Sequence, residues 1–187
     1  VMHMGYIFLG IAGLNELSLS GAAVLMVAHG LSIAALFALC GVLRERTGTL
    51  EFVQLGGLAK PMPRLGLLFG FAAMASVGLP GFANFPGELM VFFGAFGSGN
   101  AFGEGFHFSA IQIATVVAVW GVVISAVYML RAYRSVFFGT MPEKWAGLAD
   151  VATIPRYAVI LLVVALLIIG FYPQLMLGYI APSLLLP

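Results

Sequence analysis

The chain has 187 residues, of which 62% are hydrophobic and only 8% are charged. Its mean hydropathy of +1.11 lies far above that of soluble domains, in which about a quarter of the residues are charged. The composition therefore predicts an all-α, polytopic membrane helix bundle. The net charge of +1 offers no strongly one-signed surface, which excludes nucleic acid as a partner. The single cysteine, Cys40, excludes a disulfide framework and a cysteine-ligated zinc or iron–sulfur centre.

Runs of residues without charge predict the membrane spans, because a helix needs about 20 apolar residues to cross about 30 Å of hydrocarbon. We interpret the whole chain, 1–187, as part of one transmembrane domain. In chain order, we expect its spans at about 1–13, 20–43, 64–98, 109–133 and 157–180. The first is too short to cross alone, and the chain begins with Val rather than Met. We therefore expect 1–13 to be the second half of a helix and the chain to be the C-terminal part of a longer protein.

The basic residues predict which way the bundle faces. All eight Lys and Arg lie in two connections, at 44–64 and 131–156, whereas the connections at 14–19 and 98–108 contain none. By the positive-inside rule, the two basic connections are cytoplasmic. We therefore expect the other connections and the C-terminus on the outer side.

The third expected span contains an interruption. As one continuous helix, residues 64–98 would be about 52 Å long, well beyond a bilayer core. The helix-breaking residues Pro80, Gly81, Pro86 and Gly87 predict a break there. Interrupted membrane helices free backbone groups and are typical of ion sites in transporters. A simple proline kink is the alternative.

Glu88 follows this interruption and is the only charged residue that cannot be assigned to a connection. An acidic residue at the centre of a membrane helix costs about 2.5 to 3.5 kcal/mol on insertion scales, so it faces the protein interior and has a function or a partner. We predict that Glu88 binds and releases a proton. The alternative is a glutamate that only satisfies the backbone groups freed by the break.

Two histidines, His3 and His29, are predicted to lie at the depth of Glu88. Counted from the nearest outer connection at about 1.5 Å per residue, all three lie about 14 to 16 Å from the outer face, near the midplane. Three protonatable side chains on three helices at one depth indicate a proton-transfer route in the membrane plane, with waters bridging the gaps. The alternative is that each histidine only hydrogen-bonds to a neighbouring helix.

Short motifs along nearly the whole chain resemble the subunit M family of proton-translocating NADH-quinone oxidoreductase, respiratory complex I. The motifs that occur in the same order are His3-Met4-Gly5, Ala28-His29-Gly30-Leu31-Ser32, Glu45-Arg46-Thr47, Leu55-Gly56-Gly57-Leu58, Met62-Pro63, Gly78-Leu79-Pro80-Gly81, Asn84-Phe85 with Gly87-Glu88, and Val136-Phe137-Phe138-Gly139. By this resemblance, the chain is the C-terminal part of an antiporter-like transmembrane domain. Glu88 would be the key acid of a broken helix, and His29 and His3 would belong to the hydrophilic axis that supplies it with protons.

The resemblance also implies a cellular setting. The chain would be a subunit of the enzyme NADH:quinone oxidoreductase in the cell inner (plasma) membrane, moving protons while quinone is reduced elsewhere. NADH, FMN, iron–sulfur clusters and quinone would be bound by partner subunits. Its neighbours in the lipid bilayer would be the antiporter-like L and N types and small membrane subunits. The sequence has no glycine-rich phosphate loop, metal-ligand pair or nucleophile-base motif, so we expect no redox chemistry and no cofactor in this chain itself.

Related families leave alternatives open. Mrp-type cation/proton antiporters and membrane-bound hydrogenase subunits resemble the same pattern, and many relatives have a lysine where this chain has Ile33. Subunits L and N also have a lysine in place of Glu88, so both positions favour the subunit M family. A cation/proton antiporter or a hydrogenase subunit is the alternative function, and a purely structural membrane subunit is a third.

Overall fold

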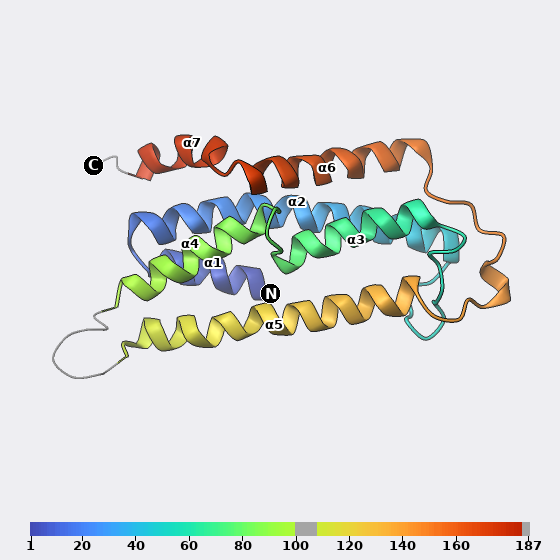
Figure 1. Ribbon diagram of the computed structural model, residues 1–187, viewed down its shortest axis with the longest axis horizontal. Coiled ribbons are helices and arrows are strands. Elements are labelled where there is room, and N and C mark those ends of the chain that lie inside the picture. Colours follow the sequence, from blue (N-terminus) through green and yellow to red (C-terminus); the bar gives the residue numbers. More distant parts are fainter. Residues whose placement is uncertain (100–107, 185–187) are drawn as a thin grey trace.

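The computed structural model describes residues 1–99 and 108–184, apart from the side chains of 153–155 (Figure 1). This part is helical and contains no strand, which confirms the predicted all-α fold class. Its elements are α1 (Met2–Ala12), α2 (Glu16–Thr47), α3 (Pro63–Val77), α4 (Asn84–Gly97), α5 (Ala110–Phe137), the 3₁₀ turn η1 (Glu143–Trp145), α6 (Thr153–Phe171) and α7 (Gln174–Leu184). Most of the expected outer connection at 98–108 lies outside the described residues.

The helices run along one common axis, with α5 and α6 on opposite sides of the bundle (Figure 1). α2 is central and packs against α1, α3, α4, α6 and α7. α2 and α5 are each long and apolar enough to cross a membrane, and α6 with α7 forms a third candidate span. α1 and α3 are shorter apolar helices. α4 follows α3 along the bundle axis (Figure 1), as the two halves of one interrupted span would.

The fifth expected span, 157–180, is two helices rather than one. α6 ends at Phe171 and α7 begins at Gln174, with a bend of 68° between them. Pro173 lies at this junction and has no backbone N–H, so it cannot continue the hydrogen-bond ladder of α6. The expectation of a continuous helix was wrong because it gave no weight to this proline.

Both ends of α2 are stabilised, which explains its length of 32 residues, beyond the expected 20–43. At its start, the Asn15 side chain accepts a hydrogen bond from the Ser18 N–H (2.9 Å), and Glu16 in the first turn complements the helix dipole. At its end, Gly48 has φ +71° and donates to the Arg44 carbonyl (2.8 Å). Glycine adopts this left-handed C-cap without strain.

Glycines allow α4 to approach α2 closely. A Cβ placed on Gly94 would lie 2.5 Å from the backbone nitrogen of Ser18, and one on Gly87 would lie 3.1 Å from that of Leu25. Small residues of this kind let membrane helices pack backbone to backbone. The contact fixes the position of α4 in the bundle, and with it the position of Glu88.

The two basic connections interlock at one end of the bundle. Asp150 accepts hydrogen bonds from the backbone N–H groups of Arg64 (2.9 Å) and Leu65 (3.1 Å). The Trp145 Nε1–H donates to the Gln54 carbonyl (3.0 Å). A carboxylate from one connection therefore caps the start of α3, the first half of the interrupted span.

Candidate functional site

A short irregular segment separates α3 from α4. α3 ends before Gly78, whose φ of +80° makes a left-handed cap, and α4 begins at Asn84. Pro80 and Gly81 lie between the two helices. Pro86 and Gly87 lie in the first turn of α4, so the break is shorter than the sequence suggested. Proline is tolerated there because the N–H groups of a first helical turn have no helical acceptor.

Glu88 lies one turn into α4, and its carboxyl packs back on the break. The residue is 4% exposed. A Cβ placed on Gly78 would lie 2.5 Å from Oε2 and 2.9 Å from Oε1 of Glu88. Position 78 therefore requires glycine for two reasons. Its φ is positive, and a side chain there would occupy the space of the Glu88 carboxyl.

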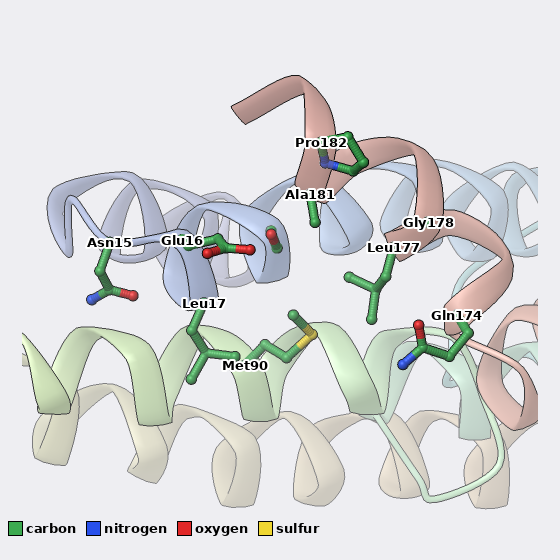
Figure 2. Close-up of a pocket in the computed structure, with 10 residues that line it drawn as sticks. Asn15, Glu16, Leu17, Met90, Gln174, Leu177, Gly178, Ala181 and Pro182 are labelled. Carbon is green, nitrogen blue, oxygen red and sulfur yellow. The ribbon is translucent and has the colours of Figure 1, made fainter. Parts of the chain in front are cut away.

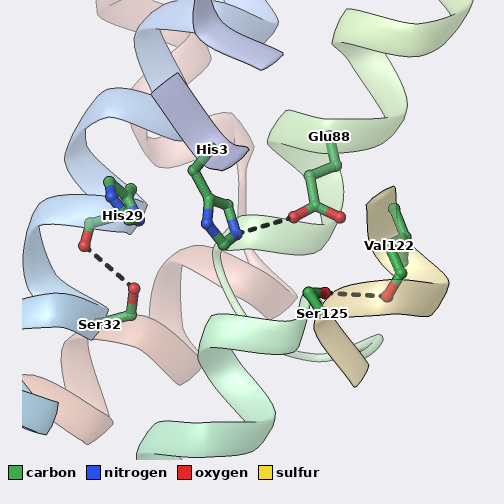
Figure 3. A network of polar contacts seen from close by, with 6 residues as sticks. All are labelled: His3, His29, Ser32, Glu88, Val122 and Ser125. Atoms are coloured by element: carbon green, nitrogen blue, oxygen red, sulfur yellow. Dashed lines mark hydrogen bonds and ion pairs between the residues drawn. The ribbon is translucent and has the colours of Figure 1, made fainter. Parts of the chain in front are cut away.

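His3 of α1 and His29 of α2 complete a row of three titratable side chains (Figure 3). Nε2 of His3 is 3.3 Å from Oε1 of Glu88, and His3 is buried. The rings of His3 and His29 stack, with centroids 4.5 Å apart and planes at 22°. The structure thus brings the three predicted residues into contact in the order Glu88, His3, His29, which we call the titratable row.

The His3–Glu88 contact has the distance of an ion pair but not the alignment of a hydrogen bond. Among the described residues, neither Nε2 of His3 nor Oε1 of Glu88 has a hydrogen-bond partner, and the buried Nδ1 of His29 has none either. A carboxylate beside an imidazolium carries no net charge, and neither does a carboxylic acid beside a neutral imidazole. A proton can therefore move between the two groups without leaving an unpaired buried charge.

Two serines near the titratable row have their hydroxyls occupied (Figure 3). Ser32 donates to the His29 carbonyl (3.0 Å), and Ser125 donates to the Val122 carbonyl (2.9 Å). Both hydrogen bonds close within one helical turn. Neither hydroxyl is therefore committed to a side chain of the row.

Sequence reasoning assigned no role at this site to two of its polar side chains, Tyr6 and Asn84. The Tyr6 ring meets the His3 ring edge to face, with centroids 5.9 Å apart, and Asn84 is completely buried at the start of α4. Tyr6 lies three residues after His3, and Asn84 lies four residues before Glu88. These spacings place each on the helix face of a predicted residue, so the signal was present in the sequence.

The site contains no metal-binding cluster in the part of the chain that the structure describes. Across residues 1–99 and 108–184, no group of three or more His, Cys, Asp or Glu side chains, the titratable row included, is arranged so that it could hold a metal ion. A separate groove of about 680 Å³ lies between α2, α4 and α7 (Figure 2). Its lining includes Glu16 and Met90 but no member of the titratable row, so it is not part of this site.

A helical membrane bundle whose interrupted helix carries a buried carboxyl, beside the first of two stacked imidazoles, defines an antiporter-like membrane subunit. The chain belongs to the family described as NADH:quinone oxidoreductase/Mrp antiporter, TM, whose model matches residues 1–114. The matched segment contains α1 to α4, and therefore the whole titratable row.

Individual relatives carry more specific names. NAD(P)H-quinone oxidoreductase chain 4 1 of Synechococcus elongatus is 43% identical over 176 residues, which cover 94% of this chain and 32% of the relative. NADH-quinone oxidoreductase subunit M of Escherichia coli K12 is 37% identical over 176 residues, which cover 93% and 32%. A chain of respiratory complex I from Thermus thermophilus with bound NADH has a TM-score of 0.83 and 32% identity, covering 96% of this chain and 35% of that chain.

These matches confirm the resemblance to the subunit M family. The chain spans about a third of the length of the curated relatives that it matches.

Proposed function

We propose that this chain forms part of a proton-translocating membrane subunit of NADH-quinone oxidoreductase. In this proposal, Glu88, His3 and His29 pass protons in the plane of the membrane together with water, while quinone is reduced on another subunit. The observation that carries the proposal is the titratable row, in which His3 lies 3.3 Å from Glu88 and stacks on His29. The family match and the identity to subunit M of E. coli support the assignment to this complex.

His3 is the middle member of the row and can relay protons between its neighbours. A proton that arrives at His29 passes through water to His3, because the stacked rings share no hydrogen bond, and then from Nε2 of His3 to Oε1 of Glu88, which releases it towards the outer side. Because a net charge in this buried row is costly, a change of charge at one end alters the proton affinity of the other. This electrostatic coupling allows a distant quinone reaction to drive the transfer without contact with the substrate.

The proposal includes the surroundings of the chain. NADH, FMN, iron–sulfur clusters and quinone are bound by partner subunits, and this chain itself transfers no electrons. Its neighbours are antiporter-like subunits of the L and N types, small membrane subunits and the lipid of the cell inner membrane. The interlocked basic connections face the cytoplasm, and the C-terminus faces the outer side.

Glu88→Gln tests the proposal, because the amide keeps the size of the side chain but cannot accept the proton. In inverted vesicles from cells that carry the variant in the full-length gene, we expect NADH oxidation to be less affected than pumping, which falls about tenfold or more. A pH-sensitive dye measures the pumping. Ser125→Ala is the matched control, since this buried hydroxyl is already bonded within its own helix. Normal pumping by Glu88→Gln would refute the assigned role.

A cation/proton antiporter is the second candidate, because the matched family description includes Mrp antiporters. Such a protein would exchange Na⁺ for H⁺ in vesicles that receive no NADH. A Na⁺-driven proton flux that is lost in Glu88→Gln would favour the antiporter. Proton movement that requires NADH and is indifferent to Na⁺ would favour the oxidoreductase subunit.

A further inference from the structure

Asn84 has a buried polar side chain that is not a member of the titratable row and does not cap a helix. The residue is 0% exposed, and neither Oδ1 nor Nδ2 has a hydrogen-bond partner in the described part of the chain. Burying an amide without partners costs free energy, and a leucine of similar volume would avoid that cost. The amide therefore calls for a partner that is not one of these protein groups.

Helix capping does not account for Asn84. A capping asparagine accepts a hydrogen bond from an N–H group two or three residues later, as Asn15 does from Ser18 (2.9 Å). In α4 the N-cap is Ala83, and this helix start has no side-chain cap hydrogen bond. Asn15 also donates to the Gly94 carbonyl (2.7 Å). The side chain of Asn15 therefore has hydrogen-bond partners within the protein, whereas that of Asn84 has none among the described residues.

The position of Asn84 relates it to Glu88. The two residues are four apart on α4, which places them one turn apart on the same face of the helix. Asn84 lies on the side of Glu88 that is nearer the break, where the backbone of Gly78 packs on the Glu88 carboxyl. Oε1 of Glu88 also lacks a hydrogen-bond partner among the described residues. Two buried polar groups that need partners therefore lie on neighbouring turns.

We propose that Asn84 binds water between the helix break and Glu88, and so positions the group that exchanges protons with the Glu88 carboxyl. An amide presents a donor and an acceptor, and water can satisfy both. A bound Na⁺ or K⁺ would satisfy Oδ1 but leave Nδ2 without a partner. The proposal makes Asn84 a positioning residue whose ligand is water.

The proton-transfer step balances. The Glu88 carboxyl, once protonated by His3, gives its proton to the water held by Asn84, and that water gives one of its own protons to the next water, so that the water is regenerated and Glu88 becomes a carboxylate. This role rests on the proposed function, whereas the binding of water at Asn84 does not.

The test uses the intact complex with variants introduced into the full-length gene. Asn84→Leu removes the hydrogen-bonding groups at similar volume, and Asn84→Ser keeps a donor and an acceptor. A structure that resolves water is expected to show a water within about 3 Å of the Asn84 amide, and none at that place in Asn84→Leu.

Infrared difference spectra on changing pH give a second measurement that does not depend on pumping. The C=O band of the protonated Glu88 carboxyl, identified by its loss in Glu88→Gln, is expected to shift to higher wavenumber in Asn84→Leu, because the carboxyl loses hydrogen bonds from water. The band stays near its original position in Asn84→Ser and in the control Ser125→Ala. Pumping is expected to fall about tenfold in Asn84→Leu and to recover to within about twofold in Asn84→Ser.

The outcomes separate this inference from the proposed function. If Glu88→Gln pumps normally, the proposed function fails, and the water structure and the infrared shift still decide the inference. If Glu88→Gln stops pumping while Asn84→Leu pumps normally with an unshifted band, the function stands and the inference is overturned. A resolved structure with no water at Asn84, or with a Na⁺-dependent ion in its place, also overturns it, whether or not Asn84→Leu assembles.

Discussion

The imidazole of His3 stacks on the imidazole of His29, with ring centroids 4.5 Å apart and planes inclined by 22°. Two imidazoles this close repel each other when both are protonated, and a low-dielectric interior strengthens the repulsion. A proton on one ring therefore disfavours a second proton on the other. Because His3 also lies 3.3 Å from Glu88, a proton on His3 has an acceptor on the side away from His29.

The middle position of His3 predicts that its replacement interrupts the row. His3→Phe keeps an aromatic ring against His29 but removes both titratable nitrogens, so α1 should pack as before while protons no longer reach Glu88 from His29. We expect pumping in inverted vesicles to fall about tenfold or more with the complex still assembled. Ser32→Ala serves as the control, since its hydroxyl bonds only to the His29 carbonyl (3.0 Å). Pumping by His3→Phe at the level of this control would contradict a relay through His3.

Gly78→Ala separates backbone strain from contact with Glu88. Gly78 and Gly48 both have positive φ, +80° and +71°, so alanine costs about 1 to 2 kcal/mol of strain at either position. A Cβ on Gly78 would also lie 2.5 Å from Oε2 of Glu88, whereas one on Gly48 would have nothing within 4 Å. We expect both variants to lower the thermal unfolding midpoint and only Gly78→Ala to reduce pumping. Equal pumping in the two variants would show that the carboxyl does not depend on the break.

Charge and helix-breaking residues made part of this site predictable from the sequence. Glu88 stood out because a carboxyl in an apolar helix is costly, and counting residues from the connections placed His3 and His29 at its depth. The direction in which each side chain turns was not predictable, because it depends on how α1, α2 and α4 pack. The order of contacts, with His3 rather than His29 against Glu88, therefore required the structure.

The prolines show a second limit of sequence reasoning. Pro86 was assigned to the break but lies in the first turn of α4, where no N–H is needed. Pro173 received no weight, yet it lies where α6 ends and α7 turns away by 68°. Pro86 lies in the first turn of a helix and leaves that helix intact, whereas Pro173 follows the last turn of a helix and prevents its continuation. The effect of a proline therefore depends on where the helix ends lie, and the sequence predicts these ends only to within several residues.

Gly94→Ala is expected to destabilise the bundle, and Gly97→Ala is not. In an exposed helix, replacing glycine by alanine stabilises by about 1 kcal/mol. At Gly97, a Cβ would have nothing within 4 Å, so this gain should be seen. At Gly94, a Cβ would lie 2.5 Å from the Ser18 backbone nitrogen, and the backbone shift needed to relieve such overpacking costs about 1 to 3 kcal/mol. Thermal unfolding midpoints in detergent should therefore move in opposite directions, and a shift of the same sign would argue against close packing of α2 on α4.

Asp150→Ala is expected to loosen the start of α3 without touching the titratable row. The Asp150 carboxylate accepts from the N–H groups of Arg64 (2.9 Å) and Leu65 (3.1 Å), which have no helical acceptor at the start of α3. Loss of such a cap costs about 0.5 to 2 kcal/mol, so the unfolding midpoint should fall while Glu88 keeps its contacts. Glu143→Ala is the control, since Glu143 is exposed in the same connection. Amide hydrogen exchange should show faster exchange at Arg64 and Leu65 in Asp150→Ala only. Unchanged exchange at both amides would mean that α3 starts without help from the second basic connection.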